Sequence, residues 1–199
     1  IIINILFFSI TIQPVVFSYL AIFIVAVGSF ELSRLFVKSK FQNLLFFALS
    51  LVIYFILSAG LFFLSLAERD LILLTFLILS IFDSFSQITG QLFGKTKIMP
   101  DISPNKTLGG VVGGTIISLV SAFLLKSLFF GTIPELFLFA FGTILFAFIG
   151  DILASFYKRK FQVKDYSNWI PGHGGFLDRF DSLIAGGAWA ALAISFLGI

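Results

Sequence analysis

Acidic and basic side chains are interleaved in residues 155–181, "SFYKRKFQVKDYSNWIPGHGGFLDRFD". The chain is 59% hydrophobic and only 12% charged, whereas soluble domains carry about 25% charged residues, so this concentration of charge is unusual. Magnesium binds carboxylates together with substrate phosphates, and Lys and Arg neutralise phosphate charge. Gly174 and Gly175, next to the only histidine, His173, can turn backbone N–H groups toward an anion. The cluster therefore predicts a site for a metal ion and phosphates, in which His173 is either a phosphate donor or a structural residue.

A second group of polar side chains lies inside an apolar stretch, where an ionisable residue costs several kcal/mol and marks a functional site. Asp83, Ser86, Gln87, Gly90 and Gln91 recur at three- and four-residue spacing. On a helix they form one polar stripe, which is typical either of a hydrogen-bonded packing seam or of a wet cleft. The aspartate favours the cleft, and we expect it to open to the cytoplasm.

Three further aspartates are expected at helix ends. Asp151 is predicted near the C-terminal end of a helix, where the helix dipole disfavours a negative charge, so it calls for a bound cation or a buried partner. Asp178 and Asp181 are three residues apart and share a face at the start of the last helix. The dipole accounts for one of these two, Asp181.

Six long apolar segments predict an all-α, polytopic membrane protein, because about 20 apolar residues span a bilayer as a helix. These segments are residues 15–36, 41–67, 71–94, 108–125, 136–157 and 180–199, and residues 1–12 make a seventh span or the remnant of one. Eleven of the 13 Lys and Arg residues follow the first, third and fifth segments. The positive-inside rule places these loops in the cytoplasm. We therefore expect six to seven transmembrane helices and an intramembrane cleft open to the cytoplasm.

The loop at 94–107, "GKTKIMPDISPNKT", is the second basic segment. Pro100 and Pro104 exclude a continuous helix there. The following "LGGVVGGT" has glycines at i, i+4 spacing, which predicts close helix packing, and it matches neither a dinucleotide fingerprint nor a Walker A motif. The absence of cysteine excludes disulfides and thiolate metal sites, and nothing supports nucleic-acid binding.

Residues 155–181 resemble the signature of the phosphatidate cytidylyltransferases (CDP-diacylglycerol synthases). The matching positions are Ser155, Lys158, Arg159, Lys164, Asp165, Pro171, His173, Gly174, Gly175, Asp178, Arg179 and Asp181. Upstream, Asp83, the segment 93–95, "ISPNKT" (102–107) and the pair Gly150 and Asp151 resemble other blocks of the family. The sequence departs from the pattern at Ala154 and at 108–110, where the family carries acidic residues. The resemblance covers about residue 79 to the end, so residues 1–70 are expected to be generic N-terminal spans. Residues 71–199 are expected to form the catalytic region, with cytoplasmic loops at 95–107 and 158–179.

The resemblance implies transfer of a cytidylyl group from CTP to phosphatidate, giving CDP-diacylglycerol and pyrophosphate for phospholipid synthesis. It implies Mg²⁺ as cofactor, with a second metal ion left open, held by Asp151 and Asp178 and with Asp181 close by. Lys158, Arg159, Lys164 and Arg179 would neutralise the phosphates, and the other wall of the cleft would be formed by Asp83, Gln87, Lys95, Ser103 and Lys106. It further implies a bacterial inner-membrane protein with its active site facing the cytoplasm. The sequence leaves open a homodimer, another lipid phosphate as substrate (a polyprenyl or ether lipid), and a non-catalytic transporter or scaffold.

Overall fold

The computed structural model describes residues 14–38, 44–169 and 174–199, and in this part of the chain it is a bundle of apolar helices. The helices are α2 (Pro14–Lys38), α3 (Leu44–Leu64), α4 (Arg69–Phe93), α5 (Leu108–Leu124), α6 (Ile133–Lys160) and α7 (Asp181–Leu197). Short 3-10 turns, η1 (Lys126–Leu128) and η2 (Leu177–Arg179), precede α6 and α7. Each predicted apolar segment from residue 15 onward corresponds to one of these helices.

Four of the helices, α2, α3, α4 and α6, are long and apolar enough to cross a membrane. The helices α5 and α7 have 17 residues each, at the lower end of the length that spans a bilayer. The structure therefore supports a membrane protein with four clear candidate spans, and the predicted count of six to seven spans is not confirmed. The predicted span at residues 1–12 lies outside the described residues.

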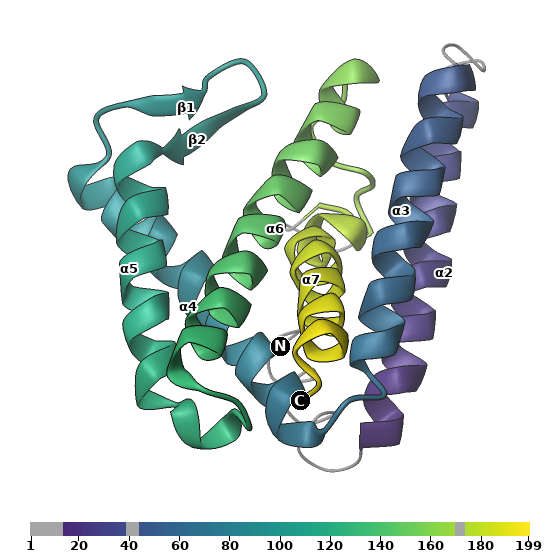
Figure 1. Ribbon diagram of the computed structural model, residues 1–199. Coiled ribbons are helices and arrows are strands. Elements are labelled where there is room, and N and C mark those ends of the chain that lie inside the picture. Colours follow the sequence, from purple (N-terminus) through teal and green to yellow (C-terminus); the bar gives the residue numbers. More distant parts are fainter. Residues whose placement is uncertain (1–13, 39–43, 170–173) are drawn as a thin grey trace.

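A small antiparallel hairpin, β1 (Lys97–Met99) and β2 (Ser103–Thr107), interrupts the all-helical pattern. Proline predicted the absence of helix in this loop but not the strands, which form because the two segments pair with each other, Lys97 opposite Thr107. The hairpin leads directly into α5, whose first turn is capped by the Thr107 hydroxyl accepting a hydrogen bond from the Gly110 N–H (3.1 Å). The hairpin lies at one end of the bundle, next to the start of α5 (Figure 1).

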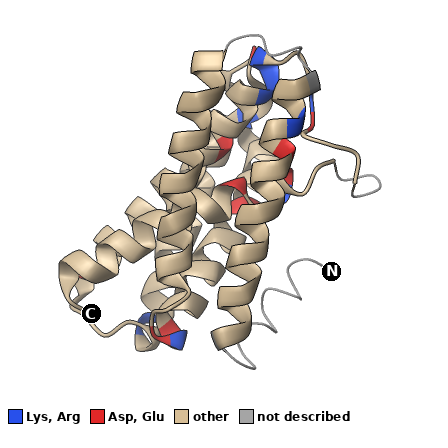
Figure 2. Ribbon diagram, turned by 90° about the vertical axis from the view of Figure 1, so that its right-hand side faces the viewer, with Lys and Arg blue, Asp and Glu red and all other residues tan. Residues whose placement is uncertain are grey.

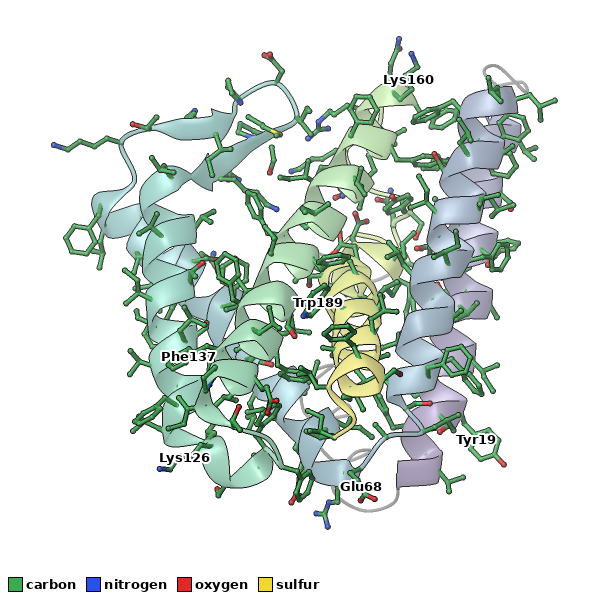
Figure 3. The ribbon with its side chains drawn as sticks, viewed as in Figure 1. Tyr19, Glu68, Lys126, Phe137, Lys160 and Trp189 are labelled. Carbon is green, nitrogen blue, oxygen red and sulfur yellow. The ribbon has the colours of Figure 1, made fainter. Side chains whose placement is uncertain are left out.

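The helix α7 lies in the interior, between α6 and α3 (Figure 1). It is rich in alanine and glycine, and alanines such as Ala185, Ala188 and Ala190 are buried against these neighbours. Its tryptophan, Trp189, lies at the α6–α7 contact beside Phe146, with ring centroids 5.0 Å apart (Figure 3). The chain thus packs its most Ala- and Gly-rich helix between two neighbouring helices.

Charged residues lie at both ends of the bundle and, for the acidic ones, also at mid-height (Figure 2). Lys160 lies at the end that carries the β1–β2 hairpin, whereas Glu68 and Lys126 lie at the opposite end (Figure 3). This separation agrees with the predicted alternation of basic loops. The acidic residues at mid-height are those that need an explanation in an apolar bundle.

The predicted close packing at "LGGVVGGT" is confirmed between α4 and α5. A Cβ added at Gly110 would lie 2.6 Å from the Ser86 carbonyl oxygen, and one added at Gly114 would lie 2.9 Å from the Ser86 nitrogen. Thr89 Oγ1 donates a hydrogen bond to the Gly110 carbonyl oxygen (3.2 Å) across the same contact. The glycines therefore allow α5 to approach the polar stripe of α4.

We predict that Gly114→Ala lowers the free energy of unfolding by about 1–3 kcal/mol, because the added methyl group meets the α4 backbone and forces the helices apart. Val112→Leu, on the exposed face of the same helix, is the matched control and should leave stability unchanged. Thermal unfolding in detergent or nanodiscs measures both. Equal melting temperatures for the two variants would contradict the close α4–α5 contact.

Candidate functional site

A polar cavity of about 260 Å³ lies between α4, β2, α5 and α6. The polar stripe of α4 contributes Asp83, Ser86 and Gln87, and β2 contributes the residues from Ser103 to Thr107 except Pro104. Asp151 of α6 and Ser182 of α7 add two further polar groups, and the rest of the lining is apolar, formed by Phe82, Gly110, Val111, Ala147 and Phe148. The structure thus brings Asp83, Gln87, Ser103 and Lys106 together opposite Asp151, as the sequence predicted. Lys95 does not line this cavity, and the binding roles of all these residues stay predictions.

Asp151 is paired with Lys106, whose Nζ lies 2.5 Å from Asp151 Oδ2. The hairpin holds this ammonium group, which also sits 4.8 Å from the centre of the Phe148 ring. The prediction that Asp151 lies near the C-terminal end of a helix was wrong, because α6 continues for nine more residues, to Lys160. The helix dipole therefore does not explain why Asp151 needs a cation, whereas its position among apolar helices does.

Asp178 organises the segment that precedes α7. Lys158 Nζ lies 2.5 Å from Asp178 Oδ1, and the side chains are 11% and 5% exposed. The backbone N–H groups of Tyr166 (2.9 Å) and Gly175 (2.8 Å) donate to Asp178 Oδ2. Both carboxylate oxygens are therefore engaged by groups of the protein itself.

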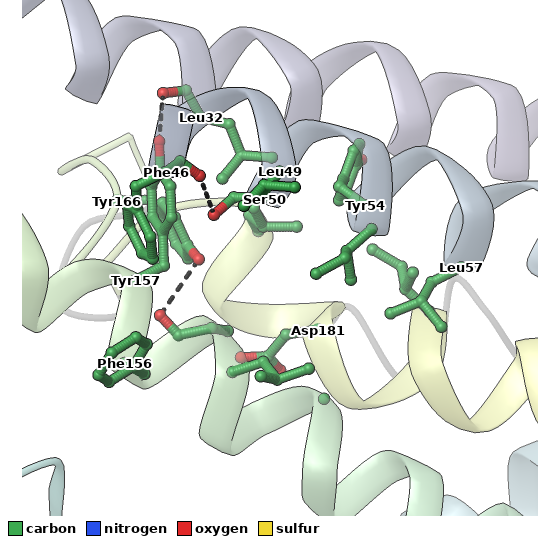
Figure 4. A pocket seen from close by; sticks show the side chains of 16 residues that line it. Leu32, Phe46, Leu49, Ser50, Tyr54, Leu57, Phe156, Tyr157, Tyr166 and Asp181 are labelled. Carbon is green, nitrogen blue, oxygen red and sulfur yellow. Dashed lines mark hydrogen bonds between the residues drawn. The ribbon is translucent and has the colours of Figure 1, made fainter. Parts of the chain in front are cut away.

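Asp181 begins α7 and its Oδ1 accepts a hydrogen bond from the Ser182 N–H (2.7 Å), which is the arrangement that the helix-dipole interpretation predicts. It lies on the wall of a second cavity of about 310 Å³, between α3, α6 and α7 (Figure 4). Apart from Asp181, this cavity is lined almost entirely by apolar and aromatic side chains, including Tyr54 and Leu57 of α3 (Figure 4). The two cavities lie on opposite faces of α6.

The predicted metal ligands, Asp151, Asp178 and Asp181, are not brought together as one group: within residues 14–38, 44–169 and 174–199, no three His, Cys, Asp or Glu side chains gather closely enough to hold a metal ion. Asp83 and Asp151 nevertheless line one cavity with the Ser103 hydroxyl and the Asn105 amide. These are hard oxygen donors, and magnesium needs only one or two carboxylates when substrate phosphates supply other ligands. The donor set of the polar cavity therefore fits magnesium. Asp178 does not line this cavity, and its carboxylate is already bonded to Lys158 and to two backbone N–H groups.

The remaining signature residues have mixed positions. Arg159 donates to the carbonyl oxygens of Ile102 (3.2 Å) and Val163 (3.0 Å), so it ties α6 to the hairpin. Ser155 Oγ lies 3.4 Å from Asp151 Oδ1. Lys164 and Arg179 are exposed. His173 lies outside the described residues, and Gly174 adopts φ +84°, a conformation that favours glycine.

Tyr166, in the signature segment (residues 161–180, between α6 and α7), is buried. Burial raises the pKa of the Tyr166 hydroxyl well above its ordinary value, so the hydroxyl stays protonated and donates to the Ala154 carbonyl oxygen (3.2 Å). This hydrogen bond connects the signature segment to α6. Trp169, by contrast, is exposed and stacks on Phe30 of α2, with ring centroids 5.5 Å apart.

Glu31 of α2 is a buried carboxylate bonded to the signature segment that sequence reasoning did not single out. It is 0% exposed, and its carboxylate accepts hydrogen bonds from Ser167 Oγ, Phe176 N and Leu177 N. The rule that singled out Asp83, an ionisable residue inside an apolar span, applies equally to Glu31. Its partners could not be identified because they lie more than a hundred residues further along the chain.

The chain resembles known proteins over nearly its whole length. The profile of the family described as "Cytidylyltransferase family" matches residues 1–197. A phosphatidate cytidylyltransferase of Rickettsia bellii (strain RML369-C) is 41% identical over 122 residues, 57% of this chain and 53% of the relative. That of Bacillus subtilis (strain 168) is 43% identical over 104 residues, 51% of this chain and 39% of the relative. That of Rickettsia felis (strain ATCC VR-1525 / URRWXCal2) is 36% identical over 173 residues, 82% of this chain and 76% of the relative. For the first two, the match spans about half of the relative's length or less.

We predict that Lys158→Met lowers the free energy of unfolding by about 3–5 kcal/mol, because it leaves the buried Asp178 carboxylate without its counter-charge. The control is Lys160→Met, two residues further along the same helix and exposed, which should change stability little. Adding Asp178→Asn to Lys158→Met should recover part of the loss, since the uncompensated charge is removed. Additive losses in this double-mutant cycle would show that the two side chains do not interact.

Proposed function

Because the chain belongs to the cytidylyltransferase family, we propose that it transfers the cytidylyl group of CTP to phosphatidate, forming CDP-diacylglycerol and pyrophosphate. The observation that carries the proposal is the polar cavity at the Lys106–Asp151 pair, which presents carboxylate, hydroxyl, amide and ammonium groups within a bundle of apolar helices that includes four candidate membrane spans. A nucleoside triphosphate needs such a polar cavity, and a lipid phosphate needs access from the bilayer. The bacterial relatives support a bacterial membrane, and the basic end of the bundle supports a site facing the cytoplasm.

In the proposed reaction, an oxygen of the lipid phosphate attacks the α-phosphorus of CTP. The new P–O bond joins lipid phosphate to CMP, the bond between the α-phosphorus and the bridging oxygen breaks, and pyrophosphate leaves with the electron pair. The lipid phosphate is itself the nucleophile, so the protein need only position the two phosphates and offset their charge. Lys106 is suited to the second task because its ammonium group already lies in the cavity.

Magnesium is proposed to be held in the polar cavity by Asp151 and Asp83. When bound, it would neutralise triphosphate charge and make the α-phosphorus more electrophilic. Lys106 is paired with Asp151, and a phosphate group offers the ammonium an alternative partner. Lys158 and Asp178 are proposed to shape the signature segment rather than to bind the metal directly, since each is already the other's partner.

The apolar cavity on the other face of α6 supports a lipid substrate. It runs along α3 from Phe46 to Leu57, roughly 16 Å at about 1.5 Å per residue, which is close to half of the ~30 Å hydrocarbon core of a bilayer. One acyl chain of a leaflet spans that distance. We therefore propose that this cavity takes an acyl chain while the headgroup end lies toward the basic end of the bundle.

The first test is turnover by the purified protein. Cytidine-labelled CTP should yield a lipid-extractable product with phosphatidate and magnesium, and chelation of magnesium should abolish it. Asp151→Asn should lower kcat by roughly 100-fold or more, because charge stabilisation at the reacting phosphates is lost. Glu68→Gln, at the opposite end of the bundle, is the control. A panel with polyprenyl and ether-lipid phosphates tests the substrate, and absence of a cytidine-containing lipid from every member would overturn the proposal.

The second test concerns the apolar cavity. Ile53→Trp fills part of it, whereas Ile56→Trp adds the same side chain on the exposed face of α3, outside the lining. We expect Ile53→Trp to lower kcat/KM for long-chain phosphatidate by roughly tenfold, the equivalent of about two methylene groups denied burial. Short-chain phosphatidate should be affected less. Equal kinetics for both variants at every chain length would exclude the cavity as the acyl-chain site.

A further inference from the structure

Glu31 lies within α2, an apolar helix that contributes no side chain to the polar cavity. A carboxylate buried among apolar helices is strongly unfavourable unless donors satisfy it. Here Oε1 accepts from Ser167 Oγ (2.5 Å) and Phe176 N (2.9 Å), and Oε2 accepts from Leu177 N (2.6 Å). All three donors belong to the signature segment. Hydrogen bonds from the signature segment thus replace the water that would solvate the Glu31 carboxylate.

The donors come from both sides of residues 170–173. Ser167 precedes them, and Phe176 and Leu177 follow them. Asp178 holds the same two sides, since its Oδ2 accepts from Tyr166 N and Gly175 N. Glu31, from α2, and Asp178, from within the segment, therefore have the same effect. Each carboxylate connects the part of the segment before residues 170–173 to the part after them.

The contact with Glu31 is too close to admit a side chain at Gly175. A Cβ added there would lie 2.9 Å from Glu31 Oε1 and 2.8 Å from the Ser167 nitrogen. Glycine at this position is therefore favoured chiefly by the nearby Ser167 backbone, and the Glu31 carboxylate adds a second close contact. The N–H of Gly175 is bonded to Asp178.

We infer that Glu31 is a positioning residue of the transferase: it fixes the signature segment so that Asp178 is held against Lys158 of α6. The inference rests on the proposed function for its kinetic consequence, but the contact itself does not. It assigns α2 to the catalytic unit, although the sequence marked residues 1–70 only as generic spans. A helix that merely anchored the bundle would need no carboxylate directed at this segment.

The experiment compares Glu31→Gln and Glu31→Ala with Glu68→Gln, an exposed glutamate at the opposite end of the bundle. Alanine leaves three donors without an acceptor, whereas glutamine keeps one acceptor oxygen and turns an NH₂ group toward another donor. We expect kcat per folded molecule to fall roughly 100-fold in Glu31→Ala, as for a misplacement of about 1 Å at a reacting centre, with glutamine intermediate and KM for CTP close to wild type. Glu68→Gln should behave as wild type.

Amide hydrogen exchange gives a readout that does not depend on activity. The amides of Phe176 and Leu177 should exchange faster in Glu31→Ala than in wild type, while amides of the α4–α5 contact keep their protection. Ser167→Ala should cause a smaller loss of turnover, and combining it with Glu31→Ala should add nothing further, because both changes remove the same contact.

Three results would overturn the inference: unchanged exchange at Phe176 and Leu177, unchanged kcat per folded molecule, or strictly additive effects of Ser167→Ala and Glu31→Ala. A purely structural role would reduce the yield of folded protein but leave turnover per folded molecule intact. If wild type turned over no lipid phosphate, the proposed function would fail, and the exchange measurement would still decide whether Glu31 holds the segment.

Discussion

Carboxylates inside an apolar bundle are stable only where donors or cations reach them, and this requirement connects the parts of the structure that are far apart in sequence. Glu31 of α2 meets Ser167, Asp151 of α6 meets Lys106 of the hairpin, and Asp178 meets Lys158. Each pair joins an element to a segment that hydrophobic packing alone would not bring to the same place. In a bilayer, where lipid is as apolar as the helix surfaces, close packing holds the helices together, and the charged contacts fix the loops against them.

The helix α6 separates two environments of opposite character. Asp151 and Phe148 face the polar cavity, whereas Gly150, Leu153 and Ala154 line the apolar one. A reaction that joins a water-soluble nucleotide to a membrane lipid requires this kind of division. The charged nucleotide is unfavourable in an apolar cavity, and the acyl chains of the lipid are unfavourable in a polar one. Ala154 lies on the apolar side, so a small uncharged residue there keeps that wall free of another carboxylate.

The sequence was most informative about local features. Apolar runs located six helices, from α2 to α7, and the glycine spacing predicted close packing of α5, because both follow from neighbouring residues; that α4 is the partner is visible only in the structure. The sequence did not predict which residues contact each other over long distances along the chain. The hairpin, the Lys106–Asp151 pair and the contacts of Glu31 are of this kind. Asp178 shows the difference most clearly, since its type and spacing suggested a metal ligand, whereas its three protein donors are visible only in three dimensions.

The central claim is that this membrane bundle joins a lipid phosphate to the α-phosphorus of CTP at the polar cavity. Phosphorus NMR of the purified protein with CTP, phosphatidate and magnesium follows every phosphorus atom in that reaction. The account predicts that the monoester resonance of phosphatidate is replaced by the coupled resonances of a diphosphate diester, with inorganic pyrophosphate appearing in equal amount. Formation of CDP together with a lipid diphosphate monoester, or an unchanged phosphatidate resonance, would contradict it.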